Sequence, residues 1–336
     1  MTTMTGTTRL LLHEASLARV GDALAAHGRA LTLLVMDGHG QITVEGQAAD
    51  TDPSGPDAAW ASNDVFESPA AREFMVAMLK APKLAWVQSA AAGFDHPIFR
   101  QLVEKGVRLT PTHTYGVGIS EYVVAGVLDH FQRGPERRAA RTAKAWRRFS
   151  LREVMGTRWL IVGFGGIGQA VAERARAFGA VITGVRRDLA PHPLAETIAA
   201  IDQLPVLLPR ADVVVLATPL TAATHRLAGA AFFAAMKPGS VLVNIGRGGL
   251  VDETALLAAL DRGVPEHAVL DVFETEPLPA ESPFWIHPRV SLTAHTSGIT
   301  SGQRARNDAA FLENLSLFLA GEPPPGAVDA RDVLAG

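Results

Sequence analysis

Cysteine is absent from the 336 residues of this chain. Its absence excludes disulfide bridges and thiolate-ligated metal sites, since both require the cysteine sulfur. We expect a cytoplasmic protein, because a chain without disulfides fits a reducing compartment. The opening residues carry no basic leader before the short apolar run Leu10–Leu12, so no secretory signal is expected.

Long hydrophobic runs and an excess of one charge are also lacking. A membrane-spanning helix needs about 20 consecutive apolar residues, and a run such as Leu31–Met36 is far shorter. The formal net charge of -3 gives no reason to expect nucleic acid or an anionic membrane as the main partner. With 48% hydrophobic and 19% charged residues, the chain is globular in composition and long enough for two domains.

A glycine-rich turn is the most informative stretch that is present. Apolar residues 160–162 lead into a G-x-G-x-x-G sequence, and an apolar helical stripe follows it. In this motif the three glycines allow a tight turn, a close backbone approach to a pyrophosphate, and tight helix packing. The start of the helix favours the anion. The predicted dinucleotide-binding residues are Gly163, Gly165, Gly166, Ile167 and Gly168.

Short apolar strands alternate with helical segments after this turn. The pattern predicts a doubly wound parallel sheet with helices on both faces. The strands are expected at 160–162, 181–185, 213–217, 241–244, 268–271 and 290–293. The earlier part alternates as well, with strands expected at 9–12, 30–36, 84–88 and 107–110, a helix at 71–79, and a further helix near the end at 301–319.

Polar residues follow three of the later strands, at the edge where a doubly wound sheet binds its ligands. Arg247, Asp271 with Glu276, and His295 stand at these strand ends. Alone, each residue has an ordinary explanation, either in solvent or in the core. Together, an arginine can hold a carboxylate and polarise the adjacent carbonyl, and a histidine oriented by a carboxylate can supply a proton. The set suits reduction of a 2-oxo acid by a nicotinamide cofactor.

Two other stretches leave alternatives open. Small residues from Ser89 to Asp95 could turn backbone N–H groups toward a ligand, although local grounds favour a simple tight connection. The basic segment 133–152 is predicted as a helix, either solvated, in contact with another subunit, or facing nucleic acid, the last being the least common. Trp146 lies among these charges, as interface tryptophans often do.

These motifs resemble the D-isomer-specific 2-hydroxyacid dehydrogenases from about residue 85 to residue 298. The resemblance rests on Gly163–Gly168, Ala217–Thr221, Met236–Glu253, Leu270–Leu278 and His295. It implies an α/β fold of two domains. A Rossmann-type doubly wound parallel sheet at 120–300 would bind the dinucleotide, and a smaller flavodoxin-like substrate domain would be formed by 1–119 and 301–336.

The resemblance also implies catalytic roles. Arg247 would bind and polarise the substrate, Glu276 would partner the histidine, and His295 would be the general acid or base. The backbone of Ala91, Ala92 and Gly93 would hold the substrate carboxylate, which replaces the local preference for a simple connection there. Ala91 stands where relatives often have glycine, and this narrows the loop.

The cofactor site implied by the resemblance adds Thr218, Pro219 and Asp271, with Asp271 at the nicotinamide amide. Many relatives carry an acidic residue for the adenosine ribose where this chain has Arg186 and Arg187. Arginine cannot accept hydrogen bonds from ribose hydroxyls, but it pairs with a 2′-phosphate. We therefore expect NADP to be preferred, with NAD possible; the alternative is two exposed arginines at a strand end.

The expected function is hydride transfer from NADPH to a small 2-oxo acid such as glyoxylate or hydroxypyruvate, giving the D-2-hydroxy acid. Two alternatives stay open: a phosphoglycerate or phosphite dehydrogenase branch of the family, and a non-enzymatic dinucleotide sensor resembling the C-terminal-binding corepressors. Enzymes of the family that the chain resembles are usually dimers. Trp146 is a candidate to reach the active site of the neighbouring subunit. We expect a homodimer without metal, nucleic-acid or membrane partners.

Overall fold

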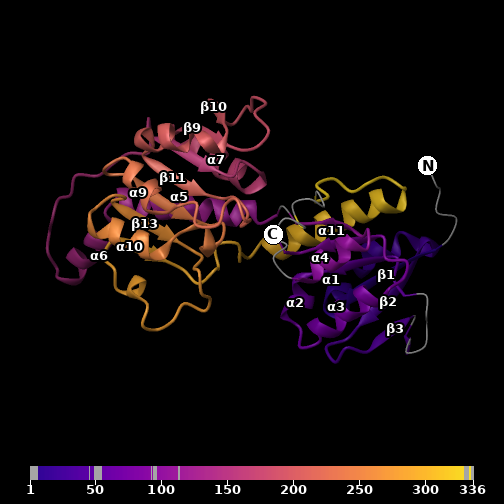
Figure 1. Cartoon of the computed structure of the whole chain (residues 1–336). Helices are drawn as coiled ribbons and strands as arrows, with labels where there is room; N and C mark the ends of the chain where they lie inside the picture. Colours follow the sequence, from indigo (N-terminus) through magenta and orange to yellow (C-terminus); the bar gives the residue numbers. More distant parts are fainter. Residues whose placement is uncertain are drawn as a thin grey trace. The chain divides into compact units, whose positions relative to one another are not determined.

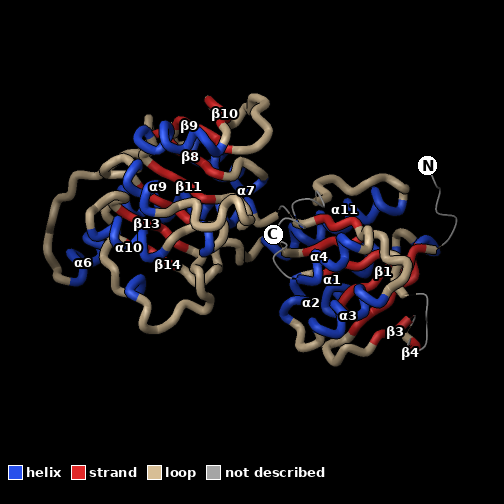
Figure 2. The backbone as a smooth tube through the Cα atoms, viewed as in Figure 1, coloured by secondary structure: helices blue, strands red, loops and turns tan. Residues whose placement is uncertain are grey.

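The chain folds into two compact units, Met1–Thr114 with Ser301–Gly336, and Tyr115–Thr300. They are called the first and the second unit below. The computed structural model describes residues 7–44, 46–48, 55–91, 93, 97–112, 114–328 and 333 (Figure 1). In each unit, helices lie against a sheet (Figure 2). The expected α/β class with two domains is confirmed.

The first unit is built on a sheet in the order β4-β3-β2-β1-β5-β6-β7. Its strands are β1 (Thr8–His13), β2 (Leu31–Met36), β3 (Ile42–Val44), β4 (Gln47–Ala48), β5 (Ala58–Ala61), β6 (Trp86–Ser89) and β7 (Arg108–Thr110). The pairs among β2, β1, β5, β6 and β7 are parallel, whereas β3 and β4 extend the edge antiparallel. The parallel part has the flavodoxin-like strand order 2-1-3-4-5.

Helices cover this first sheet, and one of them comes from the far end of the chain. They are α1 (Glu14–Ala25), η1 (Gly28–Ala30), α2 (Asn63–Glu67), α3 (Ala71–Lys80), α4 (Pro97–Glu104) and α11 (Gln303–Leu319). Helix α11, yellow in Figure 1, lies with the indigo and purple elements of this unit. Phe311 of α11 stacks on Trp60 with ring centroids 4.0 Å apart, and Phe318 stacks on Trp86 at 5.0 Å. Burial of these rings anchors the helix.

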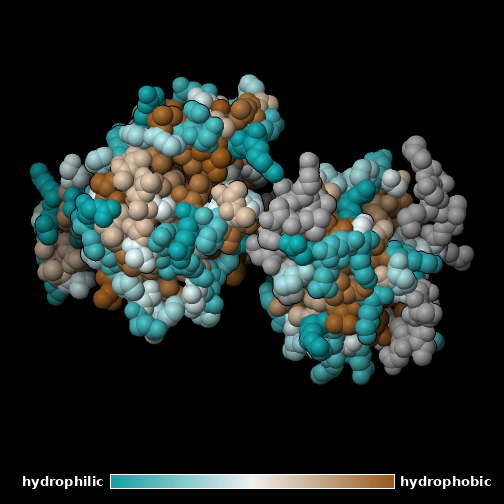
Figure 3. All heavy atoms as spheres, in the orientation of Figure 1, coloured by the Kyte–Doolittle hydropathy of each residue, from teal (hydrophilic) through white to brown (hydrophobic). Residues whose placement is uncertain are grey.

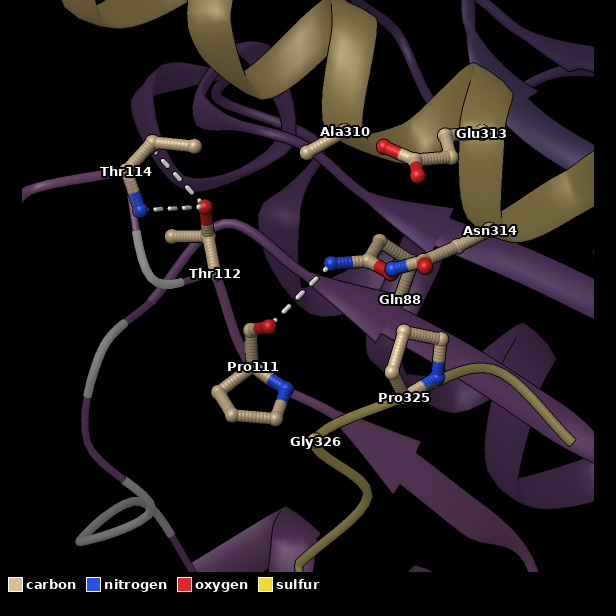
Figure 4. Close-up of a pocket in the computed structure, with 9 residues that line it drawn as sticks. All are labelled: Gln88, Pro111, Thr112, Thr114, Ala310, Glu313, Asn314, Pro325 and Gly326. Atoms are coloured by element: carbon tan, nitrogen blue, oxygen red, sulfur yellow. Dashed lines mark hydrogen bonds between the residues drawn. The ribbon is translucent and has the colours of Figure 1, made fainter. Parts of the chain in front are cut away.

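Polar side chains of α11 are buried beside this aromatic stack. Asn314 donates to Gln88 Oε1 at 2.8 Å, and Thr112 donates to Asn307 Oδ1 at 2.7 Å. A cavity of about 190 Å³ lies next to them (Figure 4). Because buried amides and hydroxyls are costly without partners, this network fixes the register of α11 on the ends of β6 and β7.

The second unit carries a fully parallel sheet in the order β10-β9-β8-β11-β12-β13-β14. Its strands are β8 (Arg158–Val162), β9 (Val181–Val185), β10 (Thr197–Ala199), β11 (Val213–Leu216), β12 (Val241–Asn244), β13 (His267–Leu270) and β14 (Val290–Leu292). This is the Rossmann order 3-2-1-4-5-6 with one strand added. The expected strands are therefore confirmed to within a few residues.

Alternate side chains of each central strand enter different cores. Trp159 and Ile161 pack on one face of the second sheet, and Leu160 and Val162 on the other. The surrounding helices are α5 (Gly116–Phe131), α6 (Gly134–Thr142), α7 (Gly166–Ala177), η2 (Ile201–Gln203), α8 (Leu204–Leu207), η3 (Leu208–Arg210), α9 (Ala230–Ala235), η4 (Gly248–Leu250), α10 (Glu253–Asp261) and η5 (Pro283–Trp285). Burial on both faces explains why the strands are continuously apolar.

The prediction of one basic helix at 133–152 is wrong. Helix α6 ends at Thr142, and Lys144 has a φ of 52°. That left-handed conformation cannot continue a right-handed helix. The segment 145–153, called the basic arm below, has no helix or strand. Near its end, Arg152 donates hydrogen bonds to Gly239 O at 2.6 Å and to Asp212 Oδ1 at 2.8 Å. Trp146 is 98% exposed on this arm.

The surface of each unit is mixed. On the face shown in Figure 3, hydrophilic residues surround smaller groups of hydrophobic ones. Among the helices that the structure describes, we find none with the length and apolar character needed to cross a bilayer.

A stacked histidine pair, with His267 buried and His130 half-buried, lies at the start of β13. His267 stacks on His130 of α5 with ring centroids 4.4 Å apart, and its Nε2 lies 3.0 Å from Ser291 Oγ. Burial lowers the pKa of His267 to about 3, and it lowers the pKa of His130 as well. The folded second unit therefore favours the neutral imidazoles.

This pair predicts a loss of stability in acid. An unfolded histidine titrates at about pH 6.5, so below that pH the unfolded chain binds protons that folded His267 rejects. We expect the free energy of unfolding to fall as the pH drops from 6.5 toward 3, and His267→Gln to flatten this slope. Urea titrations at several pH values measure it. Equal slopes for the wild type and the variant would contradict the assignment.

Candidate active site

The carboxyl ends of the second sheet are aligned by strand pairing. Val162 pairs with Leu216, Leu216 with Asn244, and Asn244 with Leu270. The residues that follow these four positions therefore emerge at one edge. The glycine-rich turn, the Thr218 loop, the Arg247 turn and the Asp271 loop all start there.

The glycine-rich turn is shaped by backbone contacts. Gly163 has a φ of 100°, and a Cβ at this position would lie 2.4 Å from the carbonyl carbon of Ala217. A Cβ on Gly168 would lie 2.1 Å from Gly163 O, so both positions require glycine. A Cβ on Gly165 would meet no described atom within 4 Å. The open approach to Gly165, at the start of α7, fits the expected pyrophosphate position.

The two arginines begin beside this turn. Val185 O, at the end of β9, accepts hydrogen bonds from the N–H groups of Gly163 and Phe164 at 3.0 and 3.1 Å. The next residue, Arg186, donates from Nε to Asp188 O at 2.6 Å and from Nη2 to Ala190 O at 2.7 Å. Its guanidinium is thus held by its own loop, next to the exposed Arg187. Both cations stand where the adenosine end of a dinucleotide is expected.

The loop after β11 carries Thr218 and Pro219. Thr224 Oγ1 donates to Pro219 O at 2.8 Å and accepts from the N–H of Thr221 at the same distance. A Cβ on Gly246 would lie 2.9 Å from Thr218 O, so this loop packs closely on the turn that carries Arg247.

Arg247 lies on a turn that the buried Asn244 organises. The Asn244 amide donates to Arg247 O at 3.0 Å and accepts from the N–H of Gly246 at 3.2 Å. Arg247 Nη1 donates to Gly246 O at 2.8 Å. Asn244 is not among the predicted site residues; the signals in the sequence are its place at the end of an apolar strand and within the motif Met236–Glu253.

His295 and Glu276 form the closest acid–base pair of the site. His295 Nδ1 lies 2.8 Å from Glu276 Oε2, and Glu276 Oε1 accepts from the N–H of Phe273 at 3.0 Å. The histidine side chain is half exposed. Because Glu276 occupies Nδ1, the other ring nitrogen, Nε2, is the one left for a substrate.

Asp271 holds the backbone around the histidine. His295 has a φ of 53°, and its N–H donates to Asp271 O at 2.8 Å. The buried Asp271 carboxylate accepts from Thr293 Oγ1 at 2.5 Å, from the N–H of Thr296 at 2.9 Å, and from the N–H and hydroxyl groups of Ser297. These bonds stabilise an uncommon left-handed conformation. The nicotinamide contact predicted for Asp271 stays a prediction.

The predicted carboxylate loop belongs to the first unit. The N–H of Ala91 donates to Ser89 Oγ at 3.1 Å, Gly93 has no helix or strand assignment, and Ala92 lies outside the described residues. Arg247, Glu276 and His295 belong to the second unit. The role of the loop therefore stays a prediction.

Comparison with known families matches residues 124–297 to the model described as D-isomer specific 2-hydroxyacid dehydrogenase, NAD binding domain. The chain belongs to the D-isomer specific 2-hydroxyacid dehydrogenase family. The resemblance read from the motifs is confirmed, and the matched residues lie within the second unit.

The curated relatives of this D-isomer specific 2-hydroxyacid dehydrogenase family member are enzymes with different activities. Glyoxylate/hydroxypyruvate reductase B of Citrobacter koseri is 36% identical over 268 residues, 75% of this chain and 80% of the relative. D-3-phosphoglycerate dehydrogenase of Mycobacterium tuberculosis is 35% identical over 252 residues, 74% of this chain. The match covers 48% of that protein, so the chain spans about half the length of such relatives.

Solved members of the family share the fold over nearly the whole chain. A family member from Xanthobacter autotrophicus in complex with NADPH and MES has a TM-score of 0.77 at 27% identity, covering 98% of this chain and 100% of the other. The NADPH-dependent glyoxylate/hydroxypyruvate reductase of Sinorhizobium meliloti, with NADP and sulfate, has a TM-score of 0.74 at 29% identity, covering 97% and 99%.

The glycine geometry gives a prediction for dinucleotide binding in this family member. Gly165→Ala should leave the melting temperature near that of the wild type, because the Cβ enters open space, but it should weaken dinucleotide binding by crowding the expected position of the pyrophosphate. Gly168→Ala should lower the melting temperature, because its Cβ meets Gly163 O at 2.1 Å. Thermal melting and fluorescence titration with NADPH measure both effects. Undiminished affinity for the dinucleotide in Gly165→Ala would contradict the predicted pyrophosphate site.

Proposed function

We propose that the protein is an NADPH-preferring reductase of small 2-oxo acids, with glyoxylate and hydroxypyruvate as substrates and a D-2-hydroxy acid as product. The observation that carries this proposal is the 2.8 Å contact between His295 and Glu276 at the sheet edge that also bears Arg247 and the glycine-rich turn. The reductases of glyoxylate and hydroxypyruvate among its relatives support the substrate class.

Each residue of the proposed site has a defined role. Arg247 binds the substrate carboxylate and polarises the neighbouring carbonyl, since a guanidinium can donate two parallel hydrogen bonds. Glu276 holds Nδ1 of His295, so that Nε2 delivers a proton to the carbonyl oxygen as it becomes a hydroxyl. The nicotinamide, when bound, supplies the hydride. Acid and hydride donor thus act on one carbonyl.

The first unit is the substrate domain in this proposal, and the backbone at 91–93 holds the carboxylate. The sequence predicts the domain boundaries after residue 119 and after residue 300, while the compact units divide after Thr114 and after Thr300. Thr218, Pro219 and Asp271 contribute to the cofactor site of the second unit. Substitution of Gly93 by valine tests the loop, because it should raise KM for the 2-oxo acid while the affinity for NADPH stays unchanged.

A homodimer in the cytoplasm is part of the proposal. A tryptophan that is 98% exposed on a basic arm is the kind of side chain that anchors an interface, and it supports contact with a second copy. Sedimentation equilibrium tests this: the wild type should be a dimer, and Trp146→Ala should dissociate more readily. A monomeric wild type would contradict it.

Arg186 and Arg187 are proposed to bind the 2′-phosphate of NADP. The NADPH and NADP complexes of the solved relatives support this choice. We expect the wild type to have a higher kcat/KM with NADPH than with NADH, and Arg186→Asp to reverse the order, since a carboxylate accepts from ribose hydroxyls and repels a phosphate. Steady-state kinetics with both cofactors measure it. A wild-type preference for NADH would contradict the assignment.

His295 is proposed as the proton donor. His295→Ala should lower kcat by about two orders of magnitude or more, the usual range for loss of a general acid. The Kd for NADPH should stay unchanged, because the histidine lies on a different loop from the glycine-rich turn. Arg247→Ala should instead impair both kcat and KM. Normal turnover by His295→Ala would overturn the assignment.

A second candidate within the same family is phosphoglycerate dehydrogenase. The 35% identity to the mycobacterial D-3-phosphoglycerate dehydrogenases supports this second candidate. Oxidation of 3-phosphoglycerate faster than reduction of glyoxylate would support this candidate over the proposed one.

A further inference from the structure

Three segments of the second unit converge on one short loop, residues 273–276. The loop carries Glu276, the partner of the proposed proton donor. Gly248, Glu253 and Arg226 contact it from the turn after β12, from the start of α10 and from the loop after β11. We call these three residues the loop clamp.

Gly248 contacts the loop backbone directly. A Cβ at this position would lie 1.8 Å from the carbonyl carbon of Phe273 and 2.3 Å from the nitrogen of Glu274. No side chain fits at such distances, so the two backbones touch because residue 248 is glycine. Gly248 immediately follows Arg247, and the Arg247 turn therefore rests on the loop that carries Glu276.

Glu253 adds a directed bond to this contact. Its Oε1 accepts from the N–H of Glu274 at 2.7 Å. Partial burial of the carboxyl raises the pKa of Glu253. The helix α10 has a separate cap, since Asp252 accepts from the N–H of Ala255 at 3.0 Å. Capping of the helix therefore does not account for where the Glu253 side chain points.

Arg226 completes the clamp from outside. Its guanidinium lies 3.0 Å from Glu274 Oε1, and its N–H donates to Gly249 O at 2.8 Å. An exposed ion pair contributes little to stability by itself, because water screens the two charges. We therefore place the main effect on the Glu253 bond and the Gly248 contact.

Three hydrogen bonds link Glu253, through the loop 273–276, to His295. Glu253 holds the N–H of Glu274, Glu276 Oε1 holds the N–H of Phe273, and Glu276 Oε2 meets His295 Nδ1. Since two consecutive N–H groups of one loop are fixed by two carboxylates, a displacement of the loop would carry Glu276 away from the histidine.

We propose that Glu253 is a positioning residue for the Glu276–His295 pair. Together with Gly248, it keeps that pair in register with Arg247, so that the proton donor and the carboxylate-binding arginine meet the same substrate. This inference rests on the proposed function, because it concerns the residues that the proposed reaction uses. It extends the site to a residue that neither binds substrate nor transfers a proton.

Three substitutions of Glu253 test the proposal by kcat for glyoxylate reduction. Glu253→Ala removes the acceptor, and we expect kcat to fall about tenfold or more, with an unchanged Kd for NADPH. Glu253→Gln keeps an oxygen acceptor at the same reach and should stay within about threefold of the wild type, as expected when a hydrogen bond and not the charge matters. Glu253→Asp, which shortens the side chain and preserves charge, should give an intermediate loss.

A matched control is Glu281→Ala, which removes an exposed carboxylate of the same unit and should leave kcat unchanged. Melting temperatures verify that the variants are folded; if Glu253→Ala does not fold, Glu253→Asp and Glu253→Gln carry the comparison. Equal kcat values for the wild type, Glu253→Ala and Glu253→Asp would overturn the proposal. So would a loss in Glu253→Gln as large as that in Glu253→Ala.

A double-mutant cycle separates this inference from the proposed function. If Glu253 acts through Glu276, Glu253→Ala should cause little further loss of kcat in the Glu276→Gln background, because residues that act as a unit are not additive. Full additivity would overturn the positioning role. A wild-type kcat in Glu276→Gln would contradict the proposed function of the Glu276–His295 pair. A loss of kcat in Glu276→Gln but not in Glu253→Ala would contradict only the positioning role of Glu253.

Discussion

The in-register parallel pairing of the second sheet is the constraint on which the site depends. Because β8, β11, β12 and β13 end side by side, the loops that follow them start along one edge. The aligned strand ends thereby bring the glycine-rich turn and the Arg247 turn to the same edge of the sheet. A shift of one residue in this pairing would move the side chains of each strand to the opposite face of the sheet, so the two different apolar cores also protect the geometry of the site.

Carboxylates that bind backbone N–H groups refine what the sheet positions. Asp271 holds the turn around His295, Glu276 holds Phe273, and Glu253 holds Glu274. Hydrogen bonds to a charged group contribute about 1.5–3 kcal/mol each, enough to stabilise a residue with positive φ such as His295. Hydrogen bonds from backbone N–H groups to carboxylates thus stabilise three places in the loops that carry the proposed proton donor and its partner.

Much of this arrangement could be predicted from the sequence, because long apolar strands and the glycine motif are local signals. Two kinds of feature could not. The sequence does not predict the short strands β3, β4, β5 and β10. Each has four residues or fewer, too few to show a pattern, and alanine-rich Ala58–Ala61 also has little β character of its own. The contact of Gly248 with Phe273 and the bond of Glu253 to Glu274 join residues that are 25 and 21 positions apart in the sequence, and only tertiary packing reveals them.

The central claim is that the Arg247, Glu276 and His295 site reduces 2-oxo acids. The most direct test is NADPH oxidation by the purified protein with a panel of glyoxylate, hydroxypyruvate and larger 2-oxo acids. The account predicts saturable NADPH oxidation with glyoxylate and hydroxypyruvate, with a D-2-hydroxy acid formed where the product is chiral. Tight binding of NADPH without turnover of any 2-oxo acid would contradict it and would favour a dinucleotide sensor.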